Sequence, residues 1–317
     1  MSLIQAIKTQ IQSLIDRANE KTGKTDADLT SAVNSLIESG GSGGFSSGLD
    51  ELIKTDFIDI NTGLATELSE TLWSGNPSRR NCTLLYFPNI TIVKEKTFSN
   101  AKIGVVNLPK VTTIEAESFY ACEGLYDVTL ENVTNIGECA FQLCYHLETL
   151  YIPNVINIGN YAFDDCEDLS SSLVLPKCET IGEYAFRETR HLGTVDLSSI
   201  KTIGEGAFSW IGGTEQNLKS LLLRSEEMCE MNITAIIGTA IVNSEGMPTG
   251  YGFVYVPSAL YENYLTDFAV KVVELATTTG TPMDEPTATY MATLILRKLE
   301  DYTVDGTTTG ELDETKI

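Results

Sequence analysis

The chain has few basic residues and few histidines for its length. Its 317 residues include 21 Lys and Arg, 44 Asp and Glu and two His, which gives a formal net charge of −23 at pH 7. The phosphates of nucleic acids and the headgroups of anionic membranes carry the same sign of charge and repel such a chain. We therefore expect neither nucleic acid binding nor membrane insertion.

Long hydrophobic runs and catalytic motifs are also missing. No window nears the roughly 18 consecutive apolar residues that a membrane-spanning helix needs. The first ten residues lack the basic start and apolar stretch of a secretory signal peptide. The sequence has no nucleophile elbow, no helix-borne pair of histidines and no phosphate-binding loop. We expect no signal peptide, no membrane anchor, no cofactor, no metal and no enzymatic activity.

The chain does contain a repeat of 21 to 23 residues between about 85 and 220. A Phe recurs once in each unit, an Ile precedes five of these Phe residues by five positions, and a Leu opens four of the units. Self-similarity at this period predicts stacked units. The three columns are Phe98, Phe119, Phe141, Phe163, Phe186 and Phe208; Ile114, Ile136, Ile158, Ile181 and Ile203; and Leu125, Leu147, Leu169 and Leu192.

The best-preserved unit, from Leu147 to Cys166, reads LETLYIPNVINIGNYAFDDC. A short alternating strand is followed by a Pro and by a return that ends at the Phe. This pattern resembles the BspA-like leucine-rich repeat over roughly residues 84–223. The resemblance implies a leucine-rich repeat solenoid, with a parallel β-strand face and turn-rich arcs, capped at both ends. It also implies a surface or adhesion-type binder without shared catalytic residues.

The flanking sequences predict five segments. Residues 218–225 and 253–264 resemble the terminal repeat and closing helix of such proteins. Within the tail, the loose alternation of residues 290–299 slightly favours a strand that could pair with another subunit. The segments are a helical attachment module at 1–38, a Gly/Ser linker at 39–48, an N-terminal cap at 49–80, the repeat domain with its C-terminal cap at 81–275, and a linker with a short strand-like tail at 276–317.

Apolar residues in the N-terminal module follow the seam of a coiled coil, and those of a second helix face inward. Isoleucine along the seam favours three or more strands, so a homotrimer is one interpretation. The alternative is that the two helices pack on each other. Residues 22–37 also resemble a helical element of phage tail and baseplate proteins, which implies docking on other virion proteins. The attachment residues are Ile4, Ile7, Ile11, Leu14, Ala18, Leu29, Val33 and Leu36.

A ligand site is predicted on the strand face, where alternate side chains point away from the core. Hydroxyls, aromatic rings and a few acids line this face and suit a host-surface glycan or protein. The alternative is a solvated face without a ligand. The predicted ligand-binding residues are Tyr86, Asn107, Asp127, Thr129, Thr149, Tyr151, Thr194 and Asp196.

Two further columns follow from the repeat. Cys122, Cys144 and Cys166 occupy the same place in three successive units, and the odd total of seven cysteines favours reduced thiols in a buried column. The residue before the opening Leu is His146, then Asp168, then His191. Stacking would place both imidazoles beside Asp168, where a solvated turn is favoured over a metal site.

Together these features favour a binding protein on the exterior of a phage particle, in its tail, baseplate or fibre. The alternative is an adhesin on a bacterial cell surface or in the extracellular space.

Overall fold

A computed structural model describes residues 58–60, 67–68, 81–86, 90–169, 172–209, 218–280 and 282–302. The predicted attachment module at 1–38 and the linker at 39–48 lie outside these residues. So do all of the proposed attachment residues, which are Ile4, Ile7, Ile11, Leu14, Ala18, Leu29, Val33 and Leu36.

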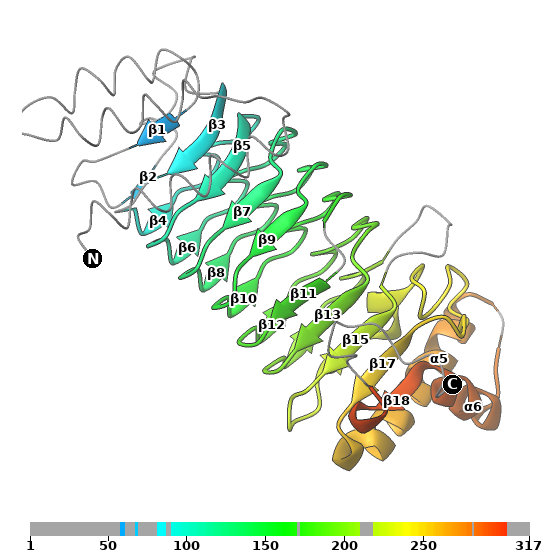
Figure 1. The fold of residues 1–317 in the computed structure, drawn as a ribbon. Helices are drawn as coiled ribbons and strands as arrows, with labels where there is room; N and C mark the ends of the chain where they lie inside the picture. The colour runs from blue at the N-terminus through cyan, green and yellow to red at the C-terminus, as the bar shows by residue number, and fades with distance from the viewer. Residues whose placement is uncertain are drawn as a thin grey trace, which may run out of the picture.

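The chain forms the leucine-rich repeat solenoid that the periodicity predicts, with one longer and one shorter parallel strand in each turn. Figure 1 shows the turns stacked along one axis, with helices α5 and α6 at the C-terminal end. The shorter strands form one continuous sheet of eight, whereas the longer strands form two separate sheets of five. All the pairings between named strands are parallel. This is expected of a solenoid, because equivalent strands in successive turns run in the same direction.

The first longer-strand sheet contains β1 (Ile58–Ile60), β3 (Asn81–Tyr86), β5 (Lys102–Asn107), β7 (Asp127–Thr129) and β9 (Thr149–Tyr151). The second contains β11 (Ser172–Leu175), β13 (Thr194–Leu197), β15 (Ser220–Leu223), β17 (Phe253–Val256) and β18 (Leu296–Lys298). The shorter strands are β2 (Glu67–Leu68), β4 (Ile92–Val93), β6 (Thr113–Ile114), β8 (Asn135–Ile136), β10 (Asn157–Ile158), β12 (Thr180–Ile181), β14 (Thr202–Ile203) and β16 (Glu230–Met231).

The phenylalanine column forms the centre of the core. The six rings stack on one another with centroids 4.9, 5.0, 5.2, 5.1 and 5.6 Å apart from Phe98 to Phe208. The isoleucine and leucine columns are buried beside them. Because the stacking distance matches the spacing of neighbouring strands, each ring fills the layer of its own turn and covers the next.

The cysteine column is buried as predicted, and its thiols are free. Each thiol donates to a carbonyl of the preceding unit, as Cys144 Sγ does to the oxygen of Phe119 at 3.2 Å. Burial raises the pKa of these thiols because a thiolate has no water there. The pKa is about 12 for Cys122, and burial has the same effect on Cys178 and Cys229.

The arcs turn tightly by placing residues in the left-handed region of backbone space. Most of these residues are not glycine: φ is 54° at Ala121 and 62° at Leu143, and similar values recur in five units. Gly206 is the exception in its column, because the Tyr184 ring lies over it. A Cβ at Gly206 would come 2.2 Å from Tyr184 Cε1.

Both ends of the solenoid carry additional elements. Within the predicted N-terminal cap, β1 and β2 pair with β3 and β4 and so extend both sides by one turn. At the other end, 3-10 helix η2 (Ile233–Ile236) follows β16, and η3 (Ser258–Leu260) leads into helix α5 (Tyr261–Thr278). Helix α5 packs against η2 and α6 and closes the core.

The C-terminal tail differs from the slight preference for a strand. Helix α6 (Glu285–Ile295) forms where alternation favoured extended chain, and only β18 and then 3-10 helix η4 (Leu299–Asp301) follow. Asp284 caps the helix by accepting from the Thr287 amide at 2.9 Å, and Ala288 and Ala292 bury one helical face. Strand β18 pairs with β17 of its own chain.

Candidate functional site

The register of the longer strands brings most of the predicted ligand-binding residues into two columns. Asp127 pairs with Thr149 in one column, and Thr129 pairs with Tyr151 in the other. Tyr86, at the end of β3, is in register with Asn107. In the second sheet Thr194 and Asp196 occupy the corresponding places on β13.

The two longer-strand sheets separate between β9 and β11. Ser171 lies near the position where the fifth unit has one more residue than its neighbours. Across this step β10 still pairs with β12, and the rings of Phe163 and Phe186 remain 5.1 Å apart. The turns therefore keep their stacking distance, and the interruption is a local irregularity of the strand face.

Asn107 and Asp127 are not available to a ligand, contrary to the prediction. Their exposed fractions are 5% and 4%. Val105, which also points outward by alternation, is only 1% exposed, so the outer side of β5 is covered as well as its core side. Alternation determines which side of a strand a residue faces, but it carries no information about what covers that side.

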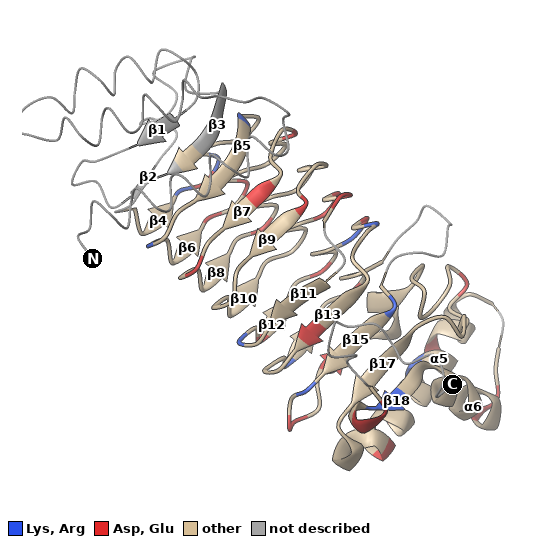
Figure 2. Cartoon of the chain, in the orientation of Figure 1, with Lys and Arg blue, Asp and Glu red and all other residues tan. Residues whose placement is uncertain are grey.

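The exposed part of the face lies on β7, β9, β11 and β13, and we call it the window. Tyr151 is 52% exposed and Val174 is 58% exposed, although large apolar side chains are usually covered. Neither β9 nor β11 contains a charged residue, as Figure 2 shows. The window consists of Thr129, Thr149, Tyr151, Ser172, Val174, Thr194 and Asp196.

The C-terminal end of the window is bounded by residues that the sequence reasoning missed. Leu299 and Tyr302 pack on the outer side of β15 and β17, where they cover Leu222 and Tyr255. The rings of Tyr255 and Tyr302 meet edge to face at 4.9 Å. Arg224 also lies on this side, two residues after Leu222 and therefore at the same parity of the strand. That parity was the one sequence signal that could have identified Arg224.

A second polar cluster lies on the arc side, around the buried carboxylate of Asp164. Arg187 donates to both of its oxygens at 2.7 Å, and Gln142 donates to Oδ2 at 2.8 Å. The Arg187 guanidinium lies near the stacked rings of Tyr161 and Tyr184. The buried charge is thus paired and hydrogen-bonded, which is the arrangement that a structural carboxylate requires.

The histidine column has the predicted order. His146 Nδ1 lies 3.0 Å from Asp168 Oδ2, and His191 Nε2 lies 3.8 Å from Asp168 Oδ1. Both imidazoles are largely exposed. Among the described residues, no group of three His, Cys, Asp or Glu side chains is arranged to hold a metal ion. In the same part of the chain, no helix has the length and apolar character to cross a membrane.

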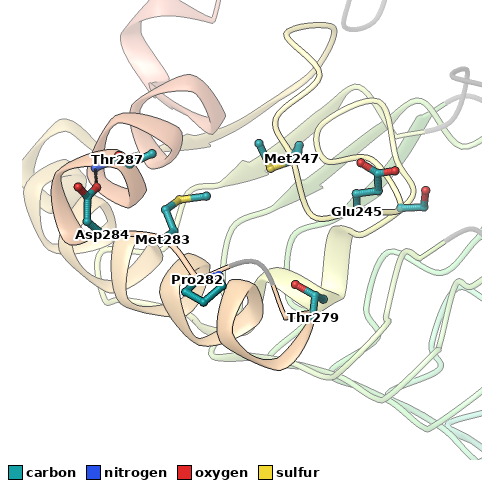
Figure 3. A pocket seen from close by; sticks show the side chains of 8 residues that line it. Glu245, Met247, Thr279, Pro282, Met283, Asp284 and Thr287 are labelled. Atoms are coloured by element: carbon teal, nitrogen blue, oxygen red, sulfur yellow. Dashed lines mark hydrogen bonds between the residues drawn. The ribbon is translucent and has the colours of Figure 1, made fainter.

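One open pocket lies away from the window, beside the junction of α5 and α6. Figure 3 shows Met247 and Met283 on opposite sides of it, with Glu245 and Asp284 nearby. Asp284 is occupied as the cap of α6, and its hydrogen bonds to Thr287 lower its pKa. The pocket lies between the closing helices and the turn at 244–247, and its lining mixes apolar and polar side chains.

The parallel register, the stacked rings and the turn-rich arcs define a leucine-rich repeat solenoid. Residues 91–213 match the BspA type leucine rich repeat region, in six copies. None of the curated proteins matches this chain.

Solved structures similar to this chain are also leucine-rich repeat proteins. One from Bacteroides ovatus ATCC 8483 is 20% identical, with a TM-score of 0.39, covering 56% of this chain and 52% of that chain. One from T. pallidum is 20% identical, with a TM-score of 0.34, covering 66% and 87%. A leucine rich cell surface protein from Faecalibacterium prausnitzii A2-165 is 16% identical, with a TM-score of 0.24, covering 65% and 85%. The present chain spans about half the length of the Bacteroides ovatus protein.

Proposed function

We propose that this protein is a non-enzymatic binding module that attaches to a surface ligand, a glycan or a protein, through the window. The observation that carries the proposal is the exposure of Tyr151 and Val174 on neighbouring turns of the solenoid. Exposed aromatic and apolar side chains on a rigid scaffold are typical anchors of binding surfaces. The stacked core below them holds these anchors in place, so binding requires little ordering of the chain.

The setting that we propose is a bacterial surface or the extracellular space, as an adhesion protein. The repeat family supports this setting, because the resemblance implies surface and adhesion-type binders. The alternative, a component of a phage virion, depends on the N-terminal module at 1–38, and no comparison supports it. Light scattering on the full chain and on a shortened chain that begins at Phe45 separates the two roles of that module. A trimeric full chain that becomes monomeric on shortening supports self-assembly. A monomeric mass for both the full and the shortened chain supports docking on another protein.

The window is tested by binding of the full chain to a panel of intact bacterial and epithelial cells, measured by flow cytometry. We expect the double variant Tyr151→Ala, Val174→Asp to lose about tenfold or more of its binding. The matched control is Val270→Asp, Tyr290→Ala, which changes the same residue types on α5 and α6. The two control residues are 54% and 61% exposed and lie outside the window.

We expect the control pair to bind as the unchanged chain does. Undiminished binding by the window variant, or no binding of the unchanged chain to any cell of the panel, would contradict the proposed function.

A further inference from the structure

A charged pair stands at the C-terminal end of the window. Arg224 Nε donates to Asp196 Oδ1 at 2.7 Å, and the side chains are 37% and 22% exposed. Within the described part of the chain, the second oxygen of Asp196 accepts no hydrogen bond, and the two terminal nitrogens of Arg224 donate none. The pair is held in position by one bond and keeps one acceptor and several donors for another molecule.

Apolar groups stand on both sides of this pair. On one side, Val174 pairs with Asp196 across the strands and is largely exposed. On the other side, Tyr302 packs against Tyr255, and the charges of Asp196 and Arg224 both act on its hydroxyl. Burial is the main cause that raises the pKa of Tyr302, so this hydroxyl keeps its proton and remains a donor.

The charge and the length of the window limit the class of ligand that it can bind. Asp196 and Arg224 neutralise each other, and β9 and β11 carry no charge. The net charge of −23 for the whole chain opposes an anionic ligand. Tyr151 and Asp196 lie on turns two steps apart, which corresponds to about 10 Å at the usual strand spacing. A ligand of two or more linked sugar rings spans this length.

A sugar ring with two neighbouring hydroxyl groups matches this arrangement. Each hydroxyl can donate to a carboxylate oxygen and accept from a guanidinium nitrogen, so adjacent hydroxyls use both halves of the pair at once. The C–H faces of the ring are apolar and fit against Val174 and the ring of Tyr151. A peptide would not need a carboxylate and a guanidinium side by side on neighbouring turns of the face.

We propose that Asp196 and Arg224, with Tyr151 and Val174, form a site for a neutral glycan that carries vicinal hydroxyl groups. This inference rests on the proposed function of the window and assigns its ligand class. Arg224 and Val174 are additions to the predicted set of residues.

The experiment measures retention of the full chain on immobilised mannan, galactan and dextran, with polygalacturonate as an anionic probe. We expect retention on at least one neutral polysaccharide and none on the anionic one. Periodate cleaves the bond between carbons that bear vicinal hydroxyls, so we expect periodate treatment of the retaining polysaccharide to abolish binding. Asp196→Asn and Arg224→Ala should each weaken binding by about tenfold or more, as loss of a hydrogen bond to a charged group does.

The matched control is Glu179→Gln, which removes the charge of another surface ion pair. Glu179 lies 2.8 Å from Lys201 and just before the shorter strand β12, outside the window. We expect it to bind as the unchanged chain does. Thermal unfolding midpoints equal to that of the unchanged chain show that the window variants are folded. Retention that survives periodate, or retention unchanged in Asp196→Asn, would overturn the glycan site, as would a lack of retention on all neutral polysaccharides.

Cell binding distinguishes the failure of this inference from the failure of the proposed function. If the window variants lose cell binding, and protease treatment of the cells removes binding while periodate does not, the window binds a protein. This outcome would support the proposed function of the window and contradict the glycan site. If the window variants bind cells normally, both are wrong.

Discussion

The stacked phenylalanine rings allow a quantitative test of the core. Phe141 is fully buried and lies between Phe119 and Phe163, with centroids 5.0 and 5.2 Å away and planes within 3° of parallel. Replacing Phe141 with Ala removes a ring that two neighbours contact. The backbone of the turn is held by strands on both sides, so the surrounding structure can close the resulting cavity only in part.

The expected cost follows from these contacts. Truncation of a buried Phe to Ala costs about 3–5 kcal/mol of unfolding free energy. Because Phe141 has a stacked ring on each side, we expect a value in the upper half of that range, about 4 kcal/mol or more. Phe208 has a described stacked ring only on the side of Phe186, at 5.6 Å. We expect Phe208→Ala to cost about 1 kcal/mol less, which is the value of one aromatic pair.

Urea denaturation followed by circular dichroism measures these differences. Tyr151→Ala is the matched control, because this aromatic side chain is 52% exposed and we expect a cost below about 1 kcal/mol. A loss of cooperativity in Phe141→Ala would show that the turns on its two sides unfold separately, as in a linear array. A cost for Phe141→Ala no larger than that for Tyr151→Ala would refute the assignment of the rings as the core.

Three further predictions follow from the backbone and the thiols. Gly182→Ala should destabilise the fold by about 2 kcal/mol, because its Cβ would lie 2.6 Å from the backbone nitrogen of the preceding turn. In Gly124→Ala the nearest atom would be 3.5 Å away, so equal urea midpoints for the two variants would contradict this reasoning. Ala121→Gly should raise the melting temperature, because φ is 54° at Ala121 and glycine adopts this left-handed conformation without strain. The control Ala116→Gly should lower the melting temperature. A lower melting temperature for both variants would exclude backbone strain at Ala121. Raising the pH from 7 to 9 should lower the unfolding free energy by about 0.8 kcal/mol for each thiol whose pKa is raised to about 12, because the unfolded thiol ionises near pH 8.5 while the folded one stays protonated. In urea denaturation, the unfolding free energy of Cys122→Ala should fall between pH 7 and pH 9 by about 0.8 kcal/mol less than that of the unchanged chain. An equal fall in both proteins would show that the pKa of Cys122 is not raised by burial.

The repeat in the sequence is enough to predict the solenoid fold. One period, seen in three independent columns, determines that units stack, and stacking brings equivalent residues together at the strand spacing. The buried cysteine column and the order of His146, Asp168 and His191 followed from the same reasoning. Near neighbours in such an array are always the same position in the adjacent unit, so sequence spacing converts directly into contact.

Only the tertiary structure decided which part of the strand face is open. Asn107 and Asp127 point outward by alternation, but the outer side of the sheet is covered at that end. Tyr302 borders the window because the chain returns across β15 and β17 after α6, where weak alternation had slightly favoured a strand. Periodicity within a unit determines the core, but it does not determine which parts of the outer face are covered. The sequence by itself therefore determined the solenoid and the direction of its side chains, and the tertiary structure decided which of those side chains are exposed.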